Sequence, residues 1–124
     1  MNWKTIVFIT VIFVAFFLIK KAGQISTKNA REYLENGALI IDVRSPAEFG
    51  SGHLAQARNI PLDSIQTILP GQVKDKSQVL LLHCQSGVRS AAAARKLKAL
   101  GYTNVFNLGS FSRARKIVDD SNLE

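Results

Sequence analysis

Cysteine is nearly absent from this chain, since Cys84 is the only one among 124 residues. A single cysteine excludes an intrachain disulfide, and it excludes the paired-cysteine motifs of zinc sites and dithiol redox proteins. Any second thiol that the chemistry requires must come from a partner or from a small molecule. The sequence shows no cluster of residues with metal-ligand spacing, so we expect no metal and no other cofactor.

Acidic residues are also few, with 9 against 16 basic residues and a formal net charge of +7. Three of the basic residues, Lys4, Lys20 and Lys21, flank an apolar run, which leaves a surplus of only four in residues 25–124. No basic stripe interleaved with aromatic residues is present, which argues against nucleic-acid binding. The length predicts one compact domain over residues 25–124. The apolar run near the start of the chain predicts that an N-terminal anchor and linker over residues 1–24 precede this domain.

Charge is absent from residues 5–19, TIVFITVIFVAFFLI. No face of this run is polar, which argues against a helix of a soluble core. Trp3 and the flanking lysines suit the two interfaces of a bilayer, and no small-residue cleavage site follows, so we expect an uncleaved single-pass transmembrane helix rather than a signal peptide. Basic residues are more frequent after the run than before it, which favours a cytoplasmic domain, with a periplasmic or extracellular domain as the alternative.

Apolar runs alternate with helix signals after residue 24. The expected strands are residues 24–25, 38–43, 57–61, 79–82 and 104–107, and the expected helices are residues 27–36, 46–49, 62–69, 91–100 and about 110–119. This alternation predicts an α/β fold with a parallel sheet. Ligands of such sheets bind beyond the carboxyl ends of the strands, where Asp42, Arg44 and Cys84 fall.

Cys84 opens a short polar loop between an apolar strand and an alanine-rich helix. We expect Ser90 at the helix N-cap, so that backbone N–H groups of the loop and of the first helical turn converge on one point. Such a cradle, with the positive end of the helix dipole behind it, suits an anion and lowers the pKa of a thiol. The alternative is a buried structural thiol, but a core cysteine needs neither a polar loop nor Arg89 beside it. We therefore interpret Cys84 as a nucleophile for an anionic substrate.

Two charged residues at the end of the strand over residues 38–43 have two interpretations each. Asp42 either orients Arg89 or a loop amide, or it caps a turn. Arg44 either attracts anionic donors or pairs with Glu48 four residues further on. The sequence leaves both pairs of alternatives open.

The two histidines are less attractive as catalytic bases. His53 lies in a Gly-containing turn, where a bond to the backbone is the stronger expectation. His83 directly precedes Cys84 on a strand, so its side chain should point to the opposite face of the sheet. We therefore assign neither histidine to catalysis.

Five short motifs, in this order along the chain, resemble the single-domain rhodanese family. They are D-V-R-x-P-x-E-F at Asp42 to Phe49, G-H-L at Gly52 to Leu54, N-I-P-L at Asn59 to Leu62, C-x-x-G-x-R-S at Cys84 to Ser90, and N-L-G at Asn107 to Gly109. Together they cover nearly all of residues 25–118. The resemblance implies a rhodanese-like parallel sheet of five strands flanked by helices, and a sulfurtransferase activity.

The resemblance also implies a mechanism. The Cys84 thiolate takes the outer sulfur of thiosulfate or a similar donor, releases sulfite and holds the sulfur as a persulfide, which cyanide or a thiol then removes. Arg89 would bind the sulfonate of the donor, since its fork-shaped guanidinium matches an oxyanion. The residues expected to bind substrate are Gln85, Ser86, Gly87, Val88, Arg89, Ser90 and Arg44, with Asp42 in support.

Three departures from the family pattern concern packing more than the loop. Gln56 and Ser110 stand where glycine is frequent, and Ala114 lies near the place of a common tryptophan. The alternatives in function are a non-catalytic or sulfur-carrying module held at a membrane, with a protein as sulfur acceptor, and a cysteine-dependent phosphatase. The phosphatase loop has one more residue between cysteine and arginine, so the shorter loop favours sulfur over a phosphoryl group.

Overall fold

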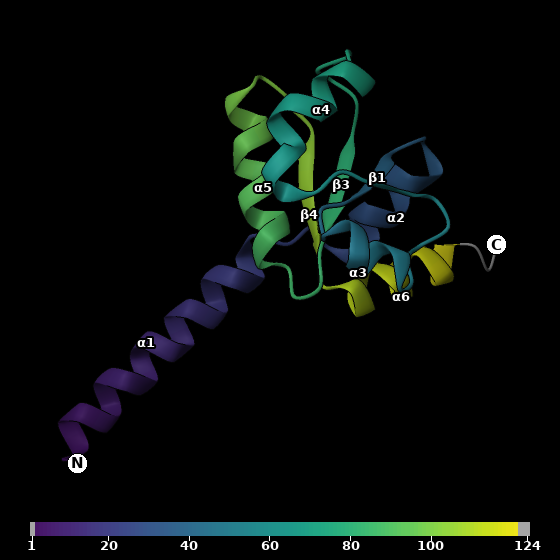
Figure 1. The fold of residues 1–124 in the computed structure, drawn as a ribbon. Helices are drawn as coiled ribbons and strands as arrows, with labels where there is room; N and C mark the ends of the chain where they lie inside the picture. The colour runs from purple at the N-terminus through teal and green to yellow at the C-terminus, as the bar shows by residue number, and fades with distance from the viewer. Residues whose placement is uncertain (1, 122–124) are drawn as a thin grey trace.

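The computed structural model describes residues 2–121, without the side chains of residues 19–22. Helix α1 (Trp3–Ala22) extends away from a domain in which helices lie on both faces of a sheet (Figure 1). The strands are β1 (Leu39–Asp42), β2 (Ala57–Asn59), β3 (Leu80–His83) and β4 (Val105–Gly109), arranged in the order β2-β1-β3-β4. All neighbouring pairs are parallel, which confirms the α/β prediction.

The expected strand over residues 24–25 is reduced to a single bridge, so the sheet of the described residues has four strands rather than five. Gln24 pairs with Asn107, and the N–H of Ile25 donates to the carbonyl oxygen of Asn107 at 3.0 Å. Ser26 already caps helix α2 (Thr27–Glu35). The chain therefore turns into the helix before a second pair of strand bonds can form.

Helix α3 (Pro46–Gly50) follows the sequence prediction closely. Ser45 is its N-cap, and the side chains and backbone N–H groups of Ser45 and Glu48 bond to each other at 3.2 Å in both directions. Pro46 occupies the first turn, where its missing N–H costs nothing. This capping box places Glu48 next to the carboxyl end of β1.

Helix α4 (Ile65–Gln72), which follows the short turn η1 (Leu62–Ser64), ends three residues later than predicted. The predicted helix ends at residue 69, before Pro70, but Pro70 lies in the last turn of α4. A proline there removes only one backbone hydrogen bond, and the N–H of Val73 still donates to the carbonyl oxygen of Leu69 at 2.8 Å. The helix therefore ends two residues after the proline.

Helix α5 (Val88–Ala99) begins earlier than predicted, so the assignment of Ser90 as N-cap was wrong. Gly87 is the N-cap, with a positive φ of 96° that lets the loop enter the helix directly. No side chain caps this end. Helix α6 (Phe111–Ser121) closes the described chain.

Two apolar layers hold the domain together, one on each face of the sheet. Successive side chains of β1 and β3 point to opposite faces, and both faces are covered, which explains why these strands are almost wholly apolar. The layer under α4 and α5 includes Ile41, Leu80, Leu82, Cys84 and Leu97. The layer under α2 and α6 includes Ile40, Leu81, Leu108 and Ile117.

Helix α1 exposes every side chain that the structure describes in it, from Trp3 to Leu18. Within residues 2–121, no helix combines the length and the apolar character that crossing a membrane requires. The structure therefore does not support the transmembrane helix that the sequence predicts over residues 5–19. This uncharged run ends at a lysine on each side and is shorter than the about 20 apolar residues of an average span.

Candidate functional site

The candidate site lies at the carboxyl end of β3, directly after His83. The pairing of β3 with β4 shifts by one residue after Leu82, so that His83 lies opposite Gly109. The N–H of Cys84 then donates to the carbonyl oxygen of Gly109 at 3.3 Å. This bond fixes the backbone of Cys84 to the neighbouring strand and leaves its side chain fully buried.

The Cys84 sulfur lies among hydrogen-bond donors of the loop and of the first turn of α5. The N–H of Gly87 donates to Sγ at 3.0 Å, and the hydroxyl of Ser90 lies 3.5 Å from Sγ. Burial by itself raises the pKa of the thiol, but donors from Ser90, Gly87 and Ser86 outweigh it and lower this pKa below its usual value. The arrangement therefore stabilises a thiolate, which is the nucleophilic form of cysteine.

Asn107 supports this cradle and was not among the site residues predicted from the sequence. Its Oδ1 accepts from the hydroxyl of Ser90 at 2.6 Å and from the N–H of Gly109 at 2.9 Å, and its Nδ2 donates to the carbonyl oxygen of Gly87 at 3.1 Å. One buried amide thus connects the start of α5 to the end of β4. The N-L-G motif was the available signal, but nothing in its spacing indicates contact with Cys84.

Arg89 forms a two-bond ion pair with Glu48 of α3. Nη1 and Nη2 of Arg89 donate to Oε1 and Oε2 of Glu48 at 2.6 and 3.0 Å. The Arg89 guanidinium, with help from the backbone of Ser45, lowers the pKa of the Glu48 carboxyl from 4.5 to about 2. Both side chains stay more than a third exposed, and Arg89 keeps N–H groups for an incoming anion.

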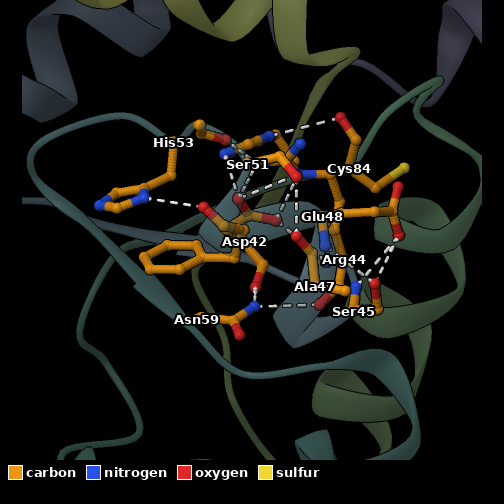
Figure 2. Close-up of polar contacts among 12 residues, drawn as sticks. Asp42, Arg44, Ser45, Ala47, Glu48, Ser51, His53, Asn59 and Cys84 are labelled. Atoms are coloured by element: carbon orange, nitrogen blue, oxygen red, sulfur yellow. Dashed lines mark hydrogen bonds and ion pairs between the residues drawn. The ribbon is translucent and has the colours of Figure 1, made fainter.

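Arg44 lies inside the protein, and both sequence interpretations of this residue differ from its place in the structure. Its guanidinium donates to the Asp42 carboxylate through Nε and Nη2 at 2.8 to 3.1 Å (Figure 2). Nη2 also donates to the carbonyl oxygen of Gly52 at 2.8 Å. Only 4% of Arg44 and none of Asp42 is exposed. The geometry favours a structural role: Asp42 orients Arg44, and Arg44 fixes the turn at Gly52, whereas Glu48 pairs with Arg89.

Both histidines lie where the sequence predicted. Nδ1 of His53 bonds to the carbonyl oxygen of Phe49 at 2.9 Å, and its ring stacks on Phe49. His83 packs on Phe111, in the layer opposite to that of the Cys84 side chain. Burial lowers the pKa of His83, which therefore stays neutral near pH 7. Among the residues described, no group of three His, Cys, Asp or Glu side chains could hold a metal ion.

The fold and the site define an α/β protein with a cysteine-centred anion loop at the end of a parallel strand. Comparison with known protein families identifies this class more closely: the family model of the rhodanese-like domain matches residues 26–114 of the chain. The chain therefore belongs to the rhodanese-like family, whose members include thiosulfate sulfurtransferases.

Three relatives illustrate the similarity. The chain is 43% identical over 77 residues to the uncharacterized protein YqhL of Bacillus subtilis (61% of this chain, 60% of YqhL) and 36% identical over 69 residues to the thiosulfate sulfurtransferase PspE of Escherichia coli (56% of this chain, 66% of PspE). The chain thus spans slightly less than two thirds of each of these two relatives. The structure resembles that of the human single-domain sulfurtransferase TSTD1, with a TM-score of 0.65, 26% identity, and coverage of 76% of this chain and 96% of TSTD1.

The first prediction concerns the hydroxyl of Ser90. Ser90→Ala removes the hydroxyl that lies 3.5 Å from Sγ and donates to Asn107 at 2.6 Å. It should raise the pKa of the Cys84 thiol, because the turn whose N–H groups face the thiolate is held less firmly. The measurement is the pH dependence of alkylation by iodoacetamide, followed by intact mass. Ser90→Thr keeps the hydroxyl, so the pKa of its Cys84 thiol should stay near that of the wild type. Ser112→Ala, on the exposed side of α6, is the control. An unchanged thiol pKa in Ser90→Ala would contradict this account.

The second prediction concerns the titration of Glu48. The carboxyl carbon resonance of Glu48 should titrate with a midpoint of about 2 in the wild type and at a higher pH, closer to 4.5, in Arg89→Ala, because the ion pair is lost while the bonds from Ser45 remain. The folded-state pKa lies below the unfolded value, so the pair stabilises the fold fully above about pH 4.5 and ceases to do so as the pH falls through about 2. Both groups are exposed, so this stabilisation should reach about 0–1 kcal/mol. Equal midpoints in the two proteins would show that Arg89 does not perturb Glu48.

Proposed function

We propose that this protein is a sulfurtransferase that moves a sulfane sulfur from thiosulfate or a similar donor to a thiol or cyanide through a persulfide on Cys84. The observation that carries the proposal is the contact of Sγ with the Gly87 N–H at 3.0 Å, with the Ser90 hydroxyl beside it. Membership of the rhodanese-like family and the activity in the name of the relative PspE support the same chemistry. The proposed reaction needs no cofactor, because the Cys84 thiol itself carries the sulfur.

In the first half-reaction the Cys84 thiolate attacks the outer sulfur of thiosulfate. A bond forms between Sγ and this sulfur, the S–S bond of the donor breaks, and sulfite leaves with the bonding electron pair. The N–H donors around Cys84 then stabilise the anionic persulfide, as they stabilise the thiolate. Arg89 lies at the start of α5 and is exposed enough to bind the sulfonate oxygens. Because Cys84 is fully buried, the groups that cover Sγ must move aside before a donor reaches it.

In the second half-reaction an acceptor attacks the outer sulfur of the persulfide. The bond between Sγ and this sulfur breaks, its electron pair stays on Sγ, and the thiolate is restored. Cyanide would leave as thiocyanate and a thiolate as a persulfide. A thiol acceptor is either a small molecule or the cysteine of a protein. In the second case the domain is a sulfur carrier.

The third prediction tests the persulfide directly. Thiosulfate should add one sulfur, about 32 Da, to the intact mass of the protein as the persulfide of Cys84, and cyanide should remove it. Cys84→Ser should fold normally and gain no mass, because a hydroxyl does not attack the sulfane sulfur.

A free thiol that takes up no sulfur in the folded wild type would contradict the sulfurtransferase proposal. A phosphate monoester assay then distinguishes the remaining alternatives. Hydrolysis that depends on Cys84 would indicate a phosphatase, and no reaction would indicate a non-catalytic module.

Membrane attachment stays a prediction from the sequence. It is based on the uncharged run of residues 5–19 and on the basic residues that follow it, which favour a cytoplasmic domain.

The fourth prediction is therefore that the full chain remains in the membrane fraction of cells after a carbonate wash, and that a chain without residues 1–24 is recovered in the soluble fraction. Added protease should cleave the domain only after the cells are opened if the domain is cytoplasmic. Recovery of the full chain in the carbonate supernatant would contradict membrane attachment.

A further inference from the structure

Two glycines with left-handed backbone conformations lie back to back behind the Cys84 loop. Gly87 has φ 96° and Gly109 has φ 95°, and a methyl group on Gly87 would lie only 3.2 Å from Cα of Gly109. The N–H of Gly87 donates to Sγ, and the carbonyl oxygen of Gly109 accepts from the N–H of Cys84. The packing of these two glycines therefore affects both the N–H donor to Sγ and the acceptor of the Cys84 N–H.

The side chain of Gln24 packs against both glycines. A methyl group on Gly109 would lie 2.8 Å from Nε2 and 3.0 Å from Cδ of Gln24, and one on Gly87 would lie 3.3 Å from Nε2. These distances are shorter than ordinary van der Waals contact, so Gln24 fills the space that a side chain on either glycine would need. Gln24, which is far from the Cys84 loop in the sequence, thus packs against the side of this loop that faces away from Sγ.

Gln24 is held in this place by the backbone around it. It pairs with Asn107 of β4, and the N–H of Ile25 donates to the carbonyl oxygen of Asn107 at 3.0 Å. The guanidinium of Arg113 donates to the carbonyl oxygens of both Ile25 and Leu108, the latter at 2.6 Å. These bonds tie the segment after α1 to the strand that carries Gly109.

We propose that Gln24 is a positioning residue for Cys84. Its side chain acts by shape: it keeps Gly87 and Gly109 packed together, so that the Gly87 N–H stays directed at Sγ and the thiolate stays stabilised. Gln24 follows the end of α1 by two residues, so this packing also links the placement of the N-terminal helix to the reactivity of the thiol. The inference uses the proposed function only in taking Cys84 as the nucleophile.

The fifth prediction compares variants of the full 124-residue chain. Gln24→Ala should raise the pKa of the Cys84 thiol and lower kcat/KM for thiosulfate about three- to tenfold, because the Gly87 donor is held less firmly. Gln24→Met keeps the length of the side chain without the amide. Its kcat/KM for thiosulfate should stay within about twofold of wild type, since the side chain acts by packing rather than by a hydrogen bond. Gln24→Asn is one methylene shorter, so its thiol pKa and its kcat/KM should lie between those of Gln24→Ala and the wild type.

Gln78→Ala is the matched control, because Gln78 is also partly buried but donates to the carbonyl oxygens of Gly37 and Val79. The readouts are the pH dependence of iodoacetamide alkylation, the kinetics with thiosulfate, and the melting temperature. A rise in thiol pKa in Gln24→Ala that Gln24→Met reverses supports the proposal.

Three results would overturn the positioning role. They are a thiol pKa in Gln24→Ala equal to that of the wild type, equal changes in Gln24→Ala and Gln24→Met, and a lower melting temperature as the only change. If the wild type accepts no sulfur from thiosulfate, the proposed function fails, but alkylation of the thiol still decides the role of Gln24.

Discussion

The hydrogen bond from the Gly87 N–H to the Cys84 sulfur is the contact on which the rest of the site depends. The left-handed φ of Gly87 then turns the chain from this loop directly into α5, a conformation that glycine adopts at no steric cost. Asn107 fixes this turn from β4, and Gly109 allows the strand end to approach it closely. The loop is therefore preorganised for an anionic sulfur, and its donors lower the pKa of the thiol although burial raises it.

Two ion pairs near the loop have different tasks because they differ in exposure. The Asp42–Arg44 pair is buried, where removal of one partner would cost about 3–5 kcal/mol by leaving a charge unpaired. It shapes the turn around Gly52 and offers nothing to a substrate. The Glu48–Arg89 pair is partly exposed and contributes little to stability, but it holds a cation at the start of α5, where an anionic donor would approach.

Much of the fold and the centre of the site could be predicted from the sequence, because the signals are local. The apolar runs around Ile41 and Leu81 predict buried parallel strands, and Ser26 and Ser45 predict helix starts within one turn of themselves. The polar loop after Cys84 predicts an anion cradle around a reactive thiol. These features depend on residues a few positions apart, whose geometry the backbone itself dictates.

The partners of the polar side chains were decided only by the tertiary structure. Arg89 and Glu48 are 41 residues apart, and Ser90 and Asn107 are 17 apart, so neither contact has a signal in sequence spacing. The same applies to the burial of Arg44 and to the contact of Gln24 with the glycines. The amino-acid sequence by itself predicted four of the five expected strands, the starts of α2 and α3, and Cys84 as the candidate nucleophile. The parallel packing of β1, β3 and β4 decided which charges and amides surround that nucleophile, because it brings together strand ends that are far apart in the chain.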